Sequence, residues 1–296
     1  MADSILNSVI LLVLLGTVAA LVLYLVSKKF YVYEDPLIDT VEDLLPGANC
    51  AGCGSPGCRS FAEKLVGSED LSDLFCPVGG NEVMQLVSEA LGKKVAEKDP
   101  TVAVIRCQGS CEVRPRTTEY QGPRSCAISS LIYSGETDCQ YGCLGDGDCV
   151  EVCKFDAMYM DEATGLPVVV TDKCTSCGMC VDACPRNIIE MRPKHKRDLK
   201  IFVGCLNEEK GGIARKACSV ACIGCSKCAD ICRKDAISMD NFLAYIDPEI
   251  CTLCRKCVDV CPTHSIIETN FPPRKPKKTD ADATIKVEPV KPQNDA

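Results

Sequence analysis

Two cysteine runs constrain the fold of this 296-residue chain more than any other feature. Each follows the pattern Cys-x2-Cys-x2-Cys-x3-Cys-Pro, first from Cys174 to Pro185 and again from Cys251 to Pro262. Three thiolates in so short a run wrap around three corners of a [4Fe–4S] cluster, and the fourth Cys binds a neighbouring cluster. Each run therefore predicts a module with two clusters and a second, partner run of cysteines.

Both partner runs lie upstream of the complete runs and depart from the full pattern. One is Cys222-x2-Cys225-x2-Cys228-x3-Cys232, followed by Arg233 instead of Pro. The other is Cys139-x3-Cys143-x5-Cys149-x3-Cys153, also without Pro. These two runs are part of an internal repeat, because five cysteines recur 79 residues later and the complete runs recur after 77 residues. The five recurring positions are Cys126, Cys139, Cys143, Cys149 and Cys153, which correspond to Cys205, Cys218, Cys222, Cys228 and Cys232. We therefore predict duplicated modules.

Cross-ligation between paired runs predicts four sets of cluster ligands. The first module supplies Cys139, Cys143, Cys149 and Cys184 for cluster 2, and Cys174, Cys177, Cys180 and Cys153 for cluster 3. The second module supplies Cys222, Cys225, Cys228 and Cys261 for cluster 4, and Cys251, Cys254, Cys257 and Cys232 for cluster 5.

The identity of one ligand of cluster 2 is undecided, because Asp146 occupies the position that corresponds to Cys225 in the second module. We favour Cys139, since thiolate is a better ligand for iron than carboxylate. The alternatives are coordination by an Asp146 oxygen and a cluster with one iron fewer. In the second module, Cys218 is an alternative to Cys225.

A separate group nearer the N-terminus predicts a fifth site, cluster 1. It has the pattern Cys50-x2-Cys53-x4-Cys58-x17-Cys76, with three glycines among the first three cysteines. Glycines allow the backbone to turn tightly and aim N–H groups at a sulfide-rich ligand. Zinc also binds four cysteines, but usually through two Cys-x2-Cys pairs. Short helices are expected at Ser60–Gly67 and Glu82–Leu91, and their expected core residues are Phe61, Leu65, Val83, Leu86 and Leu91.

These five clusters use 20 of the 25 cysteines. The remaining five are Cys107, Cys111, Cys126, Cys205 and Cys218. We expect them to serve mainly as small buried apolar residues.

The N-terminus is predicted to be a membrane anchor. Ile5 to Val26 is an uncharged stretch of 22 residues, long enough as a helix to cross a hydrocarbon core of about 30 Å. Only Asp3 precedes it, whereas a signal peptide would begin with basic residues. Lys28 and Lys29 follow it and place the bulk of the chain on the cytoplasmic side of the cytoplasmic membrane, as a single-pass protein. That compartment is reducing, which favours metal ligands over disulfides.

Composition excludes several classes of function. A net charge of −8 argues against a nucleic-acid binder, and only two His are present for triad or His-rich metal chemistry. No P-loop or dinucleotide fingerprint is present, so we expect no substrate-converting or catalytic site of the chain's own. Clusters fully ligated by Cys pass single electrons. A basic stretch, Arg192 to Lys200, is either a surface that steers an acidic electron donor or a solvated linker.

The predicted fold class is α+β. A transmembrane anchor (1–29) precedes a small, mostly helical four-Cys [4Fe–4S] domain (30–98) and a connecting segment (99–136). Two tandem two-cluster ferredoxin-like modules of βαββαβ type (137–200 and 201–268) and a disordered tail (269–296) follow. A strand is expected at Val102–Ile105, and hairpins are expected around Asp161–Gly165 and around Asp240 and Asn241.

The order of these motifs resembles the B subunits of the Rnf complex over about residues 1–268. The resemblance implies an electron-relay subunit of an ion-translocating ferredoxin:NAD oxidoreductase, which accepts electrons from reduced soluble ferredoxin. Its implied partners are the A, C, D, E and G subunits and the membrane, with Na⁺ or H⁺ as the translocated ion. The second module, 205–267, goes beyond the simplest pattern of that family.

Two other classes remain open at this point. An iron–sulfur electron-transfer subunit of another dehydrogenase or hydrogenase would share the two complete runs, but it would not need the anchor or the group at 50–76. A redox-sensing regulator would have few clusters and a basic recognition helix, and the sequence has no such helix.

Overall fold

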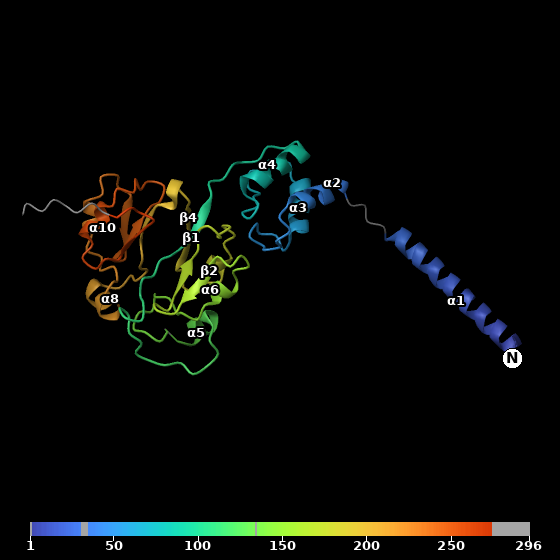
Figure 1. Cartoon of the computed structure of the whole chain (residues 1–296), viewed down its shortest axis with the longest axis horizontal. Helices are drawn as coiled ribbons and strands as arrows, with labels where there is room; N and C mark the ends of the chain where they lie inside the picture. Colours follow the sequence, from blue (N-terminus) through green and yellow to red (C-terminus); the bar gives the residue numbers. More distant parts are fainter. Residues whose placement is uncertain (1, 31–34, 134, 274–296) are drawn as a thin grey trace, which may run out of the picture. The chain divides into compact units, whose positions relative to one another are not determined.

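The computed structural model describes residues 2–30, 35–133 and 135–273 (Figure 1). The chain forms two compact units, and each is made from several stretches of sequence. Unit 1 comprises residues 1–105, 118–136 and 143–193, and unit 2 comprises residues 106–117, 137–142 and 194–296. The expected connecting segment 99–136 is divided between them.

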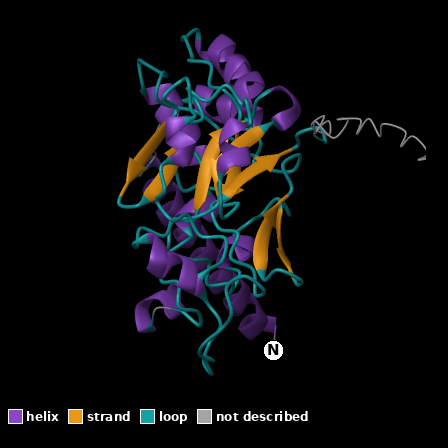
Figure 2. Ribbon diagram, turned by 90° about the vertical axis from the view of Figure 1, so that its left-hand side faces the viewer, coloured by secondary structure: helices purple, strands orange, loops and turns teal. Residues whose placement is uncertain are grey.

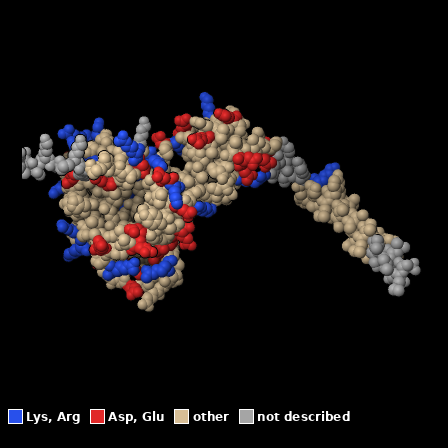
Figure 3. All heavy atoms as spheres, viewed as in Figure 1, with Lys and Arg blue, Asp and Glu red and all other residues tan. Residues whose placement is uncertain are grey.

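The N-terminal helix α1 (Ala2–Lys29) matches the predicted anchor. Its part Ile10–Lys29 is long and apolar enough to cross a membrane, and none of it is buried in the protein. Lys28 and Lys29 lie in the last turn of the helix. Figure 3 shows basic side chains in blue at one end of this helix and none along the rest of its described part. The large side chains from Ile10 to Val26 are exposed, as expected of a surface that meets lipid.

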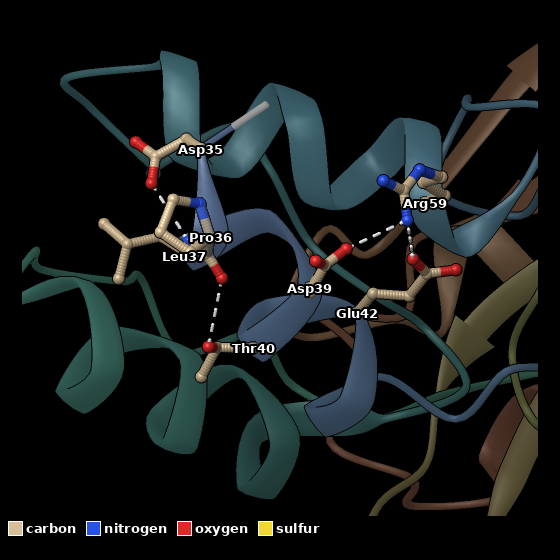
Figure 4. A network of polar contacts seen from close by, with 7 residues as sticks. All are labelled: Asp35, Pro36, Leu37, Asp39, Thr40, Glu42 and Arg59. Atoms are coloured by element: carbon tan, nitrogen blue, oxygen red, sulfur yellow. Dashed lines mark hydrogen bonds and ion pairs between the residues drawn. The ribbon is translucent and has the colours of Figure 1, made fainter. Parts of the chain in front are cut away.

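Three helices build the four-Cys domain: α2 (Pro36–Leu44), α3 (Cys58–Gly67) and α4 (Gly80–Leu91). Asp35 starts α2, because its carboxylate accepts the N–H of Leu37 at 3.0 Å and Pro36 occupies the first turn (Figure 4). Figure 4 also shows Arg59 of α3 reaching two carboxylates of α2, Asp39 at 3.1 Å and Glu42 at 2.8 Å. These exposed ion pairs contribute less than about 1 kcal/mol each, so packing holds the helices together.

The core of this domain joins all three helices. Val41 of α2, Phe61 and Leu65 of α3, and Val87 of α4 are at most 1% exposed. Burial of each such side chain stabilises the fold by about 1.5–3 kcal/mol. The expected core residues Phe61 and Leu65 are confirmed, and Val83 and Leu91 pack at the margin. Leu86 is 49% exposed, so its prediction as a core residue is wrong.

Lys93 closes the C-terminal end of α3. Its ammonium donates to the carbonyl oxygens of Leu65, Val66 and Ser68 at 3.1, 2.8 and 2.7 Å. The last carbonyls of a helix have no partner within the helix and carry partial negative charge. Lys93 therefore ties the segment after α4 to the helix that begins at Cys58.

The ferredoxin-like part of unit 1 pairs strands that are far apart in sequence. Strand β1 (Thr101–Ile105) pairs antiparallel with β4 (Ile189–Pro193), and β2 (Met158–Asp161) forms a hairpin with β3 (Leu166–Val169). The helices are α5 (Cys126–Ile132), α6 (Asp148–Glu151) and α7 (Met179–Asp182). Gly165, with a φ of +67°, closes the expected turn and donates its N–H to the Asp161 carbonyl at 2.8 Å.

Unit 2 repeats this arrangement. Strand β5 (Lys200–Val203) pairs with β8 (Ile266–Thr269), and β6 (Ile237–Asp240) forms a hairpin with β7 (Leu243–Ile246). The helices are α8 (Gly211–Ala217), α9 (Lys227–Asp230) and α10 (Lys256–Val260), with a short 3-10 turn at Lys196–Asp198. The second hairpin turns at Asn241 and Phe242, both with positive φ, as a two-residue hairpin loop requires.

Both units follow the expected order of strands and helices, βαββαβ, with α5 or α8 as an addition. The strands form two-stranded sheets, seen as short orange pairs in Figure 2. Most of the C-terminal tail, residues 274–296, lies outside the described residues, so its predicted disorder stays a prediction.

Candidate iron–sulfur sites

The N-terminal site gathers Cys50, Cys53, Cys58 and Cys76 around the start of α3. Asn49 positions Cys58, because its side-chain oxygen accepts the Cys58 N–H at 2.8 Å. Burial raises the pKa of the Cys76 thiol, backbone N–H groups partly offset this, and nearby Cys53 and Cys50 raise it further. The N–H of Gly79 points at the Cys76 sulfur at 3.4 Å. Cys53, Cys58 and Cys76 pack in one core beside the start of α3, and Cys50 is buried nearby in sequence.

The second site lies in a pocket lined by four cysteines, Cys126, Cys143, Cys149 and Cys184. Burial raises the pKa of Cys149 to about 11, and the charges of Cys126 and Cys184 contribute to this increase. The N–H of Ile188 points at the Cys184 sulfur at 3.4 Å. Three of these four residues match the sequence prediction for cluster 2, and the fourth is Cys126.

Asp148 fixes the position of Cys126. Its carboxylate accepts the N–H groups of Cys126 at 2.8 Å and Ala127 at 3.0 Å, and the Ser125 hydroxyl at 2.9 Å. These donors form the N-terminal end of α5, so a helix that was not predicted delivers a cysteine to the pocket. Burial raises the pKa of Cys126, and the backbone N–H groups of Asp148, Asp146 and Gly147 oppose this.

The two ligands that sequence reasoning considered for this place have other partners. Asp146 accepts a hydrogen bond from the Ser129 hydroxyl at 2.8 Å and lies 3.8 Å from Arg124. Cys139 is not among the residues that line the pocket, and its sulfur accepts a hydrogen bond from Asn207 at 3.6 Å. Cys139 belongs to unit 2, whereas Cys143, Cys149 and Cys184 belong to unit 1. The structure therefore favours Cys126 over the predicted Cys139.

At the third site the paired runs lie close together, because Cys153, Cys174 and Cys180 pack against the same small core. Burial raises the pKa of Cys180 to about 12, and the charges that add to this belong to Cys174, Cys177, Cys149 and Cys153. Cys153 thus lies beside the complete run, as cross-ligation requires. Cys149, a residue of the second site, is also near Cys180, so the two sites of this module are neighbours.

The two sites of unit 2 occupy separate pockets. One is lined by Cys222, Cys225, Cys228 and Cys261, and the other by Cys232, Cys251, Cys254 and Cys257. Burial raises the pKa of Cys228 to about 11 and that of Cys257 to about 12. Burial alone would also raise the pKa of Cys261, but hydrogen bonds from Ser265 and Thr263 outweigh it and lower the pKa. Cys225, rather than Cys218, lines the first pocket.

The residues present fit [4Fe–4S] clusters. Two buried hydroxyls, those of Ser55 and Thr175, have no hydrogen-bond partner among the described residues, and both belong to cysteine-bearing loops, so a sulfide could satisfy them. Within residues 2–30, 35–133 and 135–273, no three His, Cys, Asp or Glu side chains lie close enough to share one metal ion. Thiolates that bind different corners of a cluster stand further apart than the ligands of a single ion.

The predicted basic stretch does not form one surface. Arg192 is 2% exposed and pairs with Glu190 at 3.3 Å, and Lys200 is buried against Asp198. Only part of the stretch is therefore available to a partner, because strands β4 and β5 take up its two ends.

Three segments match known protein families. Residues 45–77 match a putative Fe-S cluster domain, residues 167–190 a 4Fe-4S binding domain, and residues 221–265 a 4Fe-4S dicluster domain. These matches cover the N-terminal site, both complete runs and part of unit 2.

Similar proteins match most of the chain. The B subunit of the Na⁺-translocating ferredoxin:NAD⁺ oxidoreductase complex of Acetobacterium woodii is 43% identical, over 85% of this chain and 74% of its own length. The chain belongs to the family of B subunits of Rnf-type ion-translocating oxidoreductases. The B subunit of the ion-translocating oxidoreductase complex of Methanosarcina acetivorans is 40% identical, over 85% of this chain and 94% of its own length. The B subunit of the proton-translocating ferredoxin:NAD⁺ oxidoreductase complex of Clostridium ljungdahlii is also 40% identical, over 84% of this chain and 86% of its own length. As a member of the Rnf family, the chain is an iron–sulfur electron-transfer subunit.

Proposed function

We propose that this chain is the membrane-anchored relay that accepts electrons from reduced soluble ferredoxin and passes them to the A, C, D, E and G subunits of an Rnf complex. Electron flow from ferredoxin to NAD⁺ would then drive translocation of Na⁺ or H⁺. The single observation that carries this proposal is the set of three segments that match iron–sulfur families on a chain that also has an apolar N-terminal helix. The names of the relatives support the donor and the acceptor.

We further propose five [4Fe–4S] clusters, each of which exchanges single electrons when bound. The ligand sets are those predicted from sequence, with Cys126 in place of Cys139 at cluster 2. The chain contributes burial, which raises the pKa of several ligand thiols to about 11 or 12. Loading of these sites must therefore release protons, and low pH should oppose it. The protein part supplies no substrate-converting site of its own in this proposal.

The chain's N–H and O–H groups would set how readily each site accepts an electron. Hydrogen bonds to sulfur stabilise the more negative, reduced state. At cluster 4, the Ser265 hydroxyl lies 3.3 Å from the Cys261 sulfur, and Thr263 lies 3.8 Å from it. At cluster 5, neighbouring basic residues Arg233, Lys234 and Lys256 line the pocket. These features would raise the potentials of both sites.

We propose that the bulk of the chain lies on the cytoplasmic side of the membrane. Lys28 and Lys29 end α1, and basic residues that flank a membrane span usually remain in the cytoplasm. A protease added to right-side-out vesicles should leave the chain intact, and it should degrade the chain in inverted vesicles. Degradation in right-side-out vesicles would contradict this orientation.

The relay function is tested with the full-length chain, loaded anaerobically and kept in detergent. Reduced ferredoxin should bleach the cluster absorbance of the chain, in proportion to the electrons added. Oxidised ferredoxin is the control. Absence of bleaching, or a chain that carries zinc with little iron, would refute the proposal.

The ligand choice at cluster 2 has its own test. Cys126→Ala should lower the iron content by one to four atoms per chain, because the site loses a corner or the whole cluster. Asp146→Ala is the matched control and should retain full iron, since Asp146 bonds to Ser129 instead. Iron loss in the Asp146 variant with none in the Cys126 variant would reverse the assignment.

A further inference from the structure

Four cysteines outside the clusters assigned above come together in unit 2: Cys107, Cys139, Cys205 and Cys218. Backbone hydrogen bonds join the segments that carry three of them. The N–H of Gln108, next to Cys107, donates to the Gly204 carbonyl, next to Cys205, at 3.1 Å. The N–H of Ser219, next to Cys218, donates to the Val113 carbonyl at 3.0 Å. The segment 106–117 is thus fixed at both ends against the rest of the unit.

The fourth cysteine, Cys139, reaches the same place through Asn207. This side chain is fully buried. Its backbone N–H points at the Cys205 sulfur at 3.4 Å, and its side-chain amide points at the Cys139 sulfur at 3.6 Å. The Thr117 hydroxyl donates to the Asp138 carboxylate at 2.9 Å, which holds the segment beside Cys139. One asparagine therefore donates to two sulfurs from different parts of the sequence.

Packing and burial also bring these cysteines to one place. Cys205 and Cys218 are members of one buried core of unit 2, and Val113 packs against it. Burial also raises the pKa of Cys218, and the charges of Cys107 and Cys139 add to this. Cys139, Cys205 and Cys218 are 5%, 8% and 6% exposed. The four thiols thus share one largely buried location.

A buried arginine lies at this location. Arg114 is 8% exposed, and its charge lowers the pKa of Cys218. Gly109 and Gly142 make room for it, since a methyl group at Gly109 would come within 2.9 Å of the Arg114 Nε and one at Gly142 would collide with the guanidinium. A cation here compensates the negative charge that four thiolates and a cluster would bring into a buried site.

The internal repeat explains why these cysteines are available. Cys205 is the counterpart of Cys126, and Cys218 is the counterpart of Cys139. In the first module Asp146 occupies the place of a ligand, and Cys126 fills the pocket. In the second module Cys225 lines the pocket itself. Cys205 is therefore not needed as a ligand of cluster 4, and it lies with Cys139 and Cys218 instead.

We infer that Cys107, Cys139, Cys205 and Cys218 bind a sixth [4Fe–4S] cluster. The inference rests on the proposed function, in that it assumes a chain loaded with such clusters. Structural zinc sites usually contain Cys-x2-4-Cys pairs, and no two of these four cysteines are so close in sequence. Cys205 and Cys218 pack in the same buried core as Cys222, so the sixth cluster would neighbour cluster 4 and extend the electron path within unit 2.

Iron and acid-labile sulfide per full-length chain, purified anaerobically in detergent, test this site. Six clusters require about 24 iron atoms, and five require about 20. The double variant Cys139→Ala/Cys218→Ala should lose about four iron and four sulfide, because both cysteines serve one cluster. Addition of Cys205→Ala should cause no further loss. The exposed Cys111 provides the matched control, and Cys111→Ala should retain every iron.

Other results would overturn the sixth site. A loss of about eight iron atoms in the double variant would mean that Cys139 and Cys218 serve different clusters. Loss of no iron, or of one zinc per chain, in the double variant would also exclude the sixth site. So would a content of about 20 iron atoms in the unmodified chain. The measurement on the unmodified chain holds even if the double variant fails to fold. A result near 20 leaves the five-cluster proposal intact, whereas zinc with little iron contradicts both proposals.

Discussion

Replacement of Gly224 by Ala should weaken the loop that holds cluster 4. Gly224 lies between Cys222 and Cys225 and has a φ of +64°. A side chain in this conformation costs about 1–2 kcal/mol. A methyl group there would also lie 2.7 Å from the Phe242 carbonyl oxygen and 2.8 Å from the Phe242 Cα. Relief of such a backbone collision costs about 1–3 kcal/mol more, so we expect a total of about 2–5 kcal/mol.

Two other glycines separate the causes of this cost. Gly178, in the loop of cluster 3, has a φ of +79° but open space around it, so Gly178→Ala should pay only the conformational part. Gly212 lies in α8 with open space and no positive φ, so Gly212→Ala should be neutral or slightly stabilising. The expected order of damage is therefore Gly224, then Gly178, then Gly212.

The assay is the anaerobic rate at which an iron chelator bleaches the cluster absorbance of the full-length chain. If local opening of the loop limits this loss, 2 kcal/mol corresponds to about a 30-fold faster rate. We expect at least that increase for Gly224→Ala at one cluster, and a smaller one for Gly178→Ala. Equal rates for the Gly224 and Gly212 variants would refute the reasoning from backbone geometry.

Three further predictions concern other parts of the chain. Lys93→Met should destabilise the four-Cys domain by about 1–2 kcal/mol, because three carbonyls at the C-terminal end of α3 lose a charged donor. Lys94 is exposed, so Lys94→Met should have little effect, and thermal denaturation followed by circular dichroism measures both variants. Asp148→Ala should cost about 1 kcal/mol at neutral pH. Burial alone would raise the pKa of Asp148, but the hydrogen bonds that its carboxylate accepts lower this pKa. The carboxylate therefore stabilises the fold at pH values above its unfolded pKa, and this stabilisation is lost as the pH falls through its folded pKa. The gap in melting temperature between variant and parent should therefore shrink in acid, and a constant gap would contradict this linkage. Deletion of residues 2–29 should move the chain from the membrane to the soluble fraction, and a truncated chain that still pellets with membranes would indicate a second attachment.

Local patterns in the sequence predicted much of the fold. The hairpins of both units were predicted because apolar strand residues flank short polar turns, and α3 and α4 were predicted from helical spacing. The pairing of β1 with β4 was not predicted, since about 85 residues separate the strands and no local signal sets their register. Leu86 was misplaced because periodicity gives the apolar face of a helix but not how far the core extends along it.

Some cluster ligands were likewise predicted from local sequence, and others depend on tertiary structure. Spacing within a run identifies three ligands, because those cysteines must reach one cluster from one loop. Cys126 lies 17 residues before Cys143, so its arrival depends on α5 and on the hydrogen bonds of Asp148. The repeat held a usable signal, since Cys126 and Cys205 recur together. That signal was ambiguous without the structure, because it does not show which residue compensates for Asp146.

The interleaving of the two units has a consequence for biosynthesis. The chain passes between the units five times, and unit 2 takes residues 106–117 and 137–142 from the middle of the sequence. These stretches leave the ribosome well before Lys200, the first residue of β5, is made. Unit 2 therefore cannot close during synthesis of the first 200 residues, and Cys107 and Cys139 wait for their partners as reduced thiols. A cell that makes this protein must therefore supply iron and sulfide for the sites of unit 2 after translation is nearly complete. Premature termination within the last third would leave both thiols exposed to oxidation.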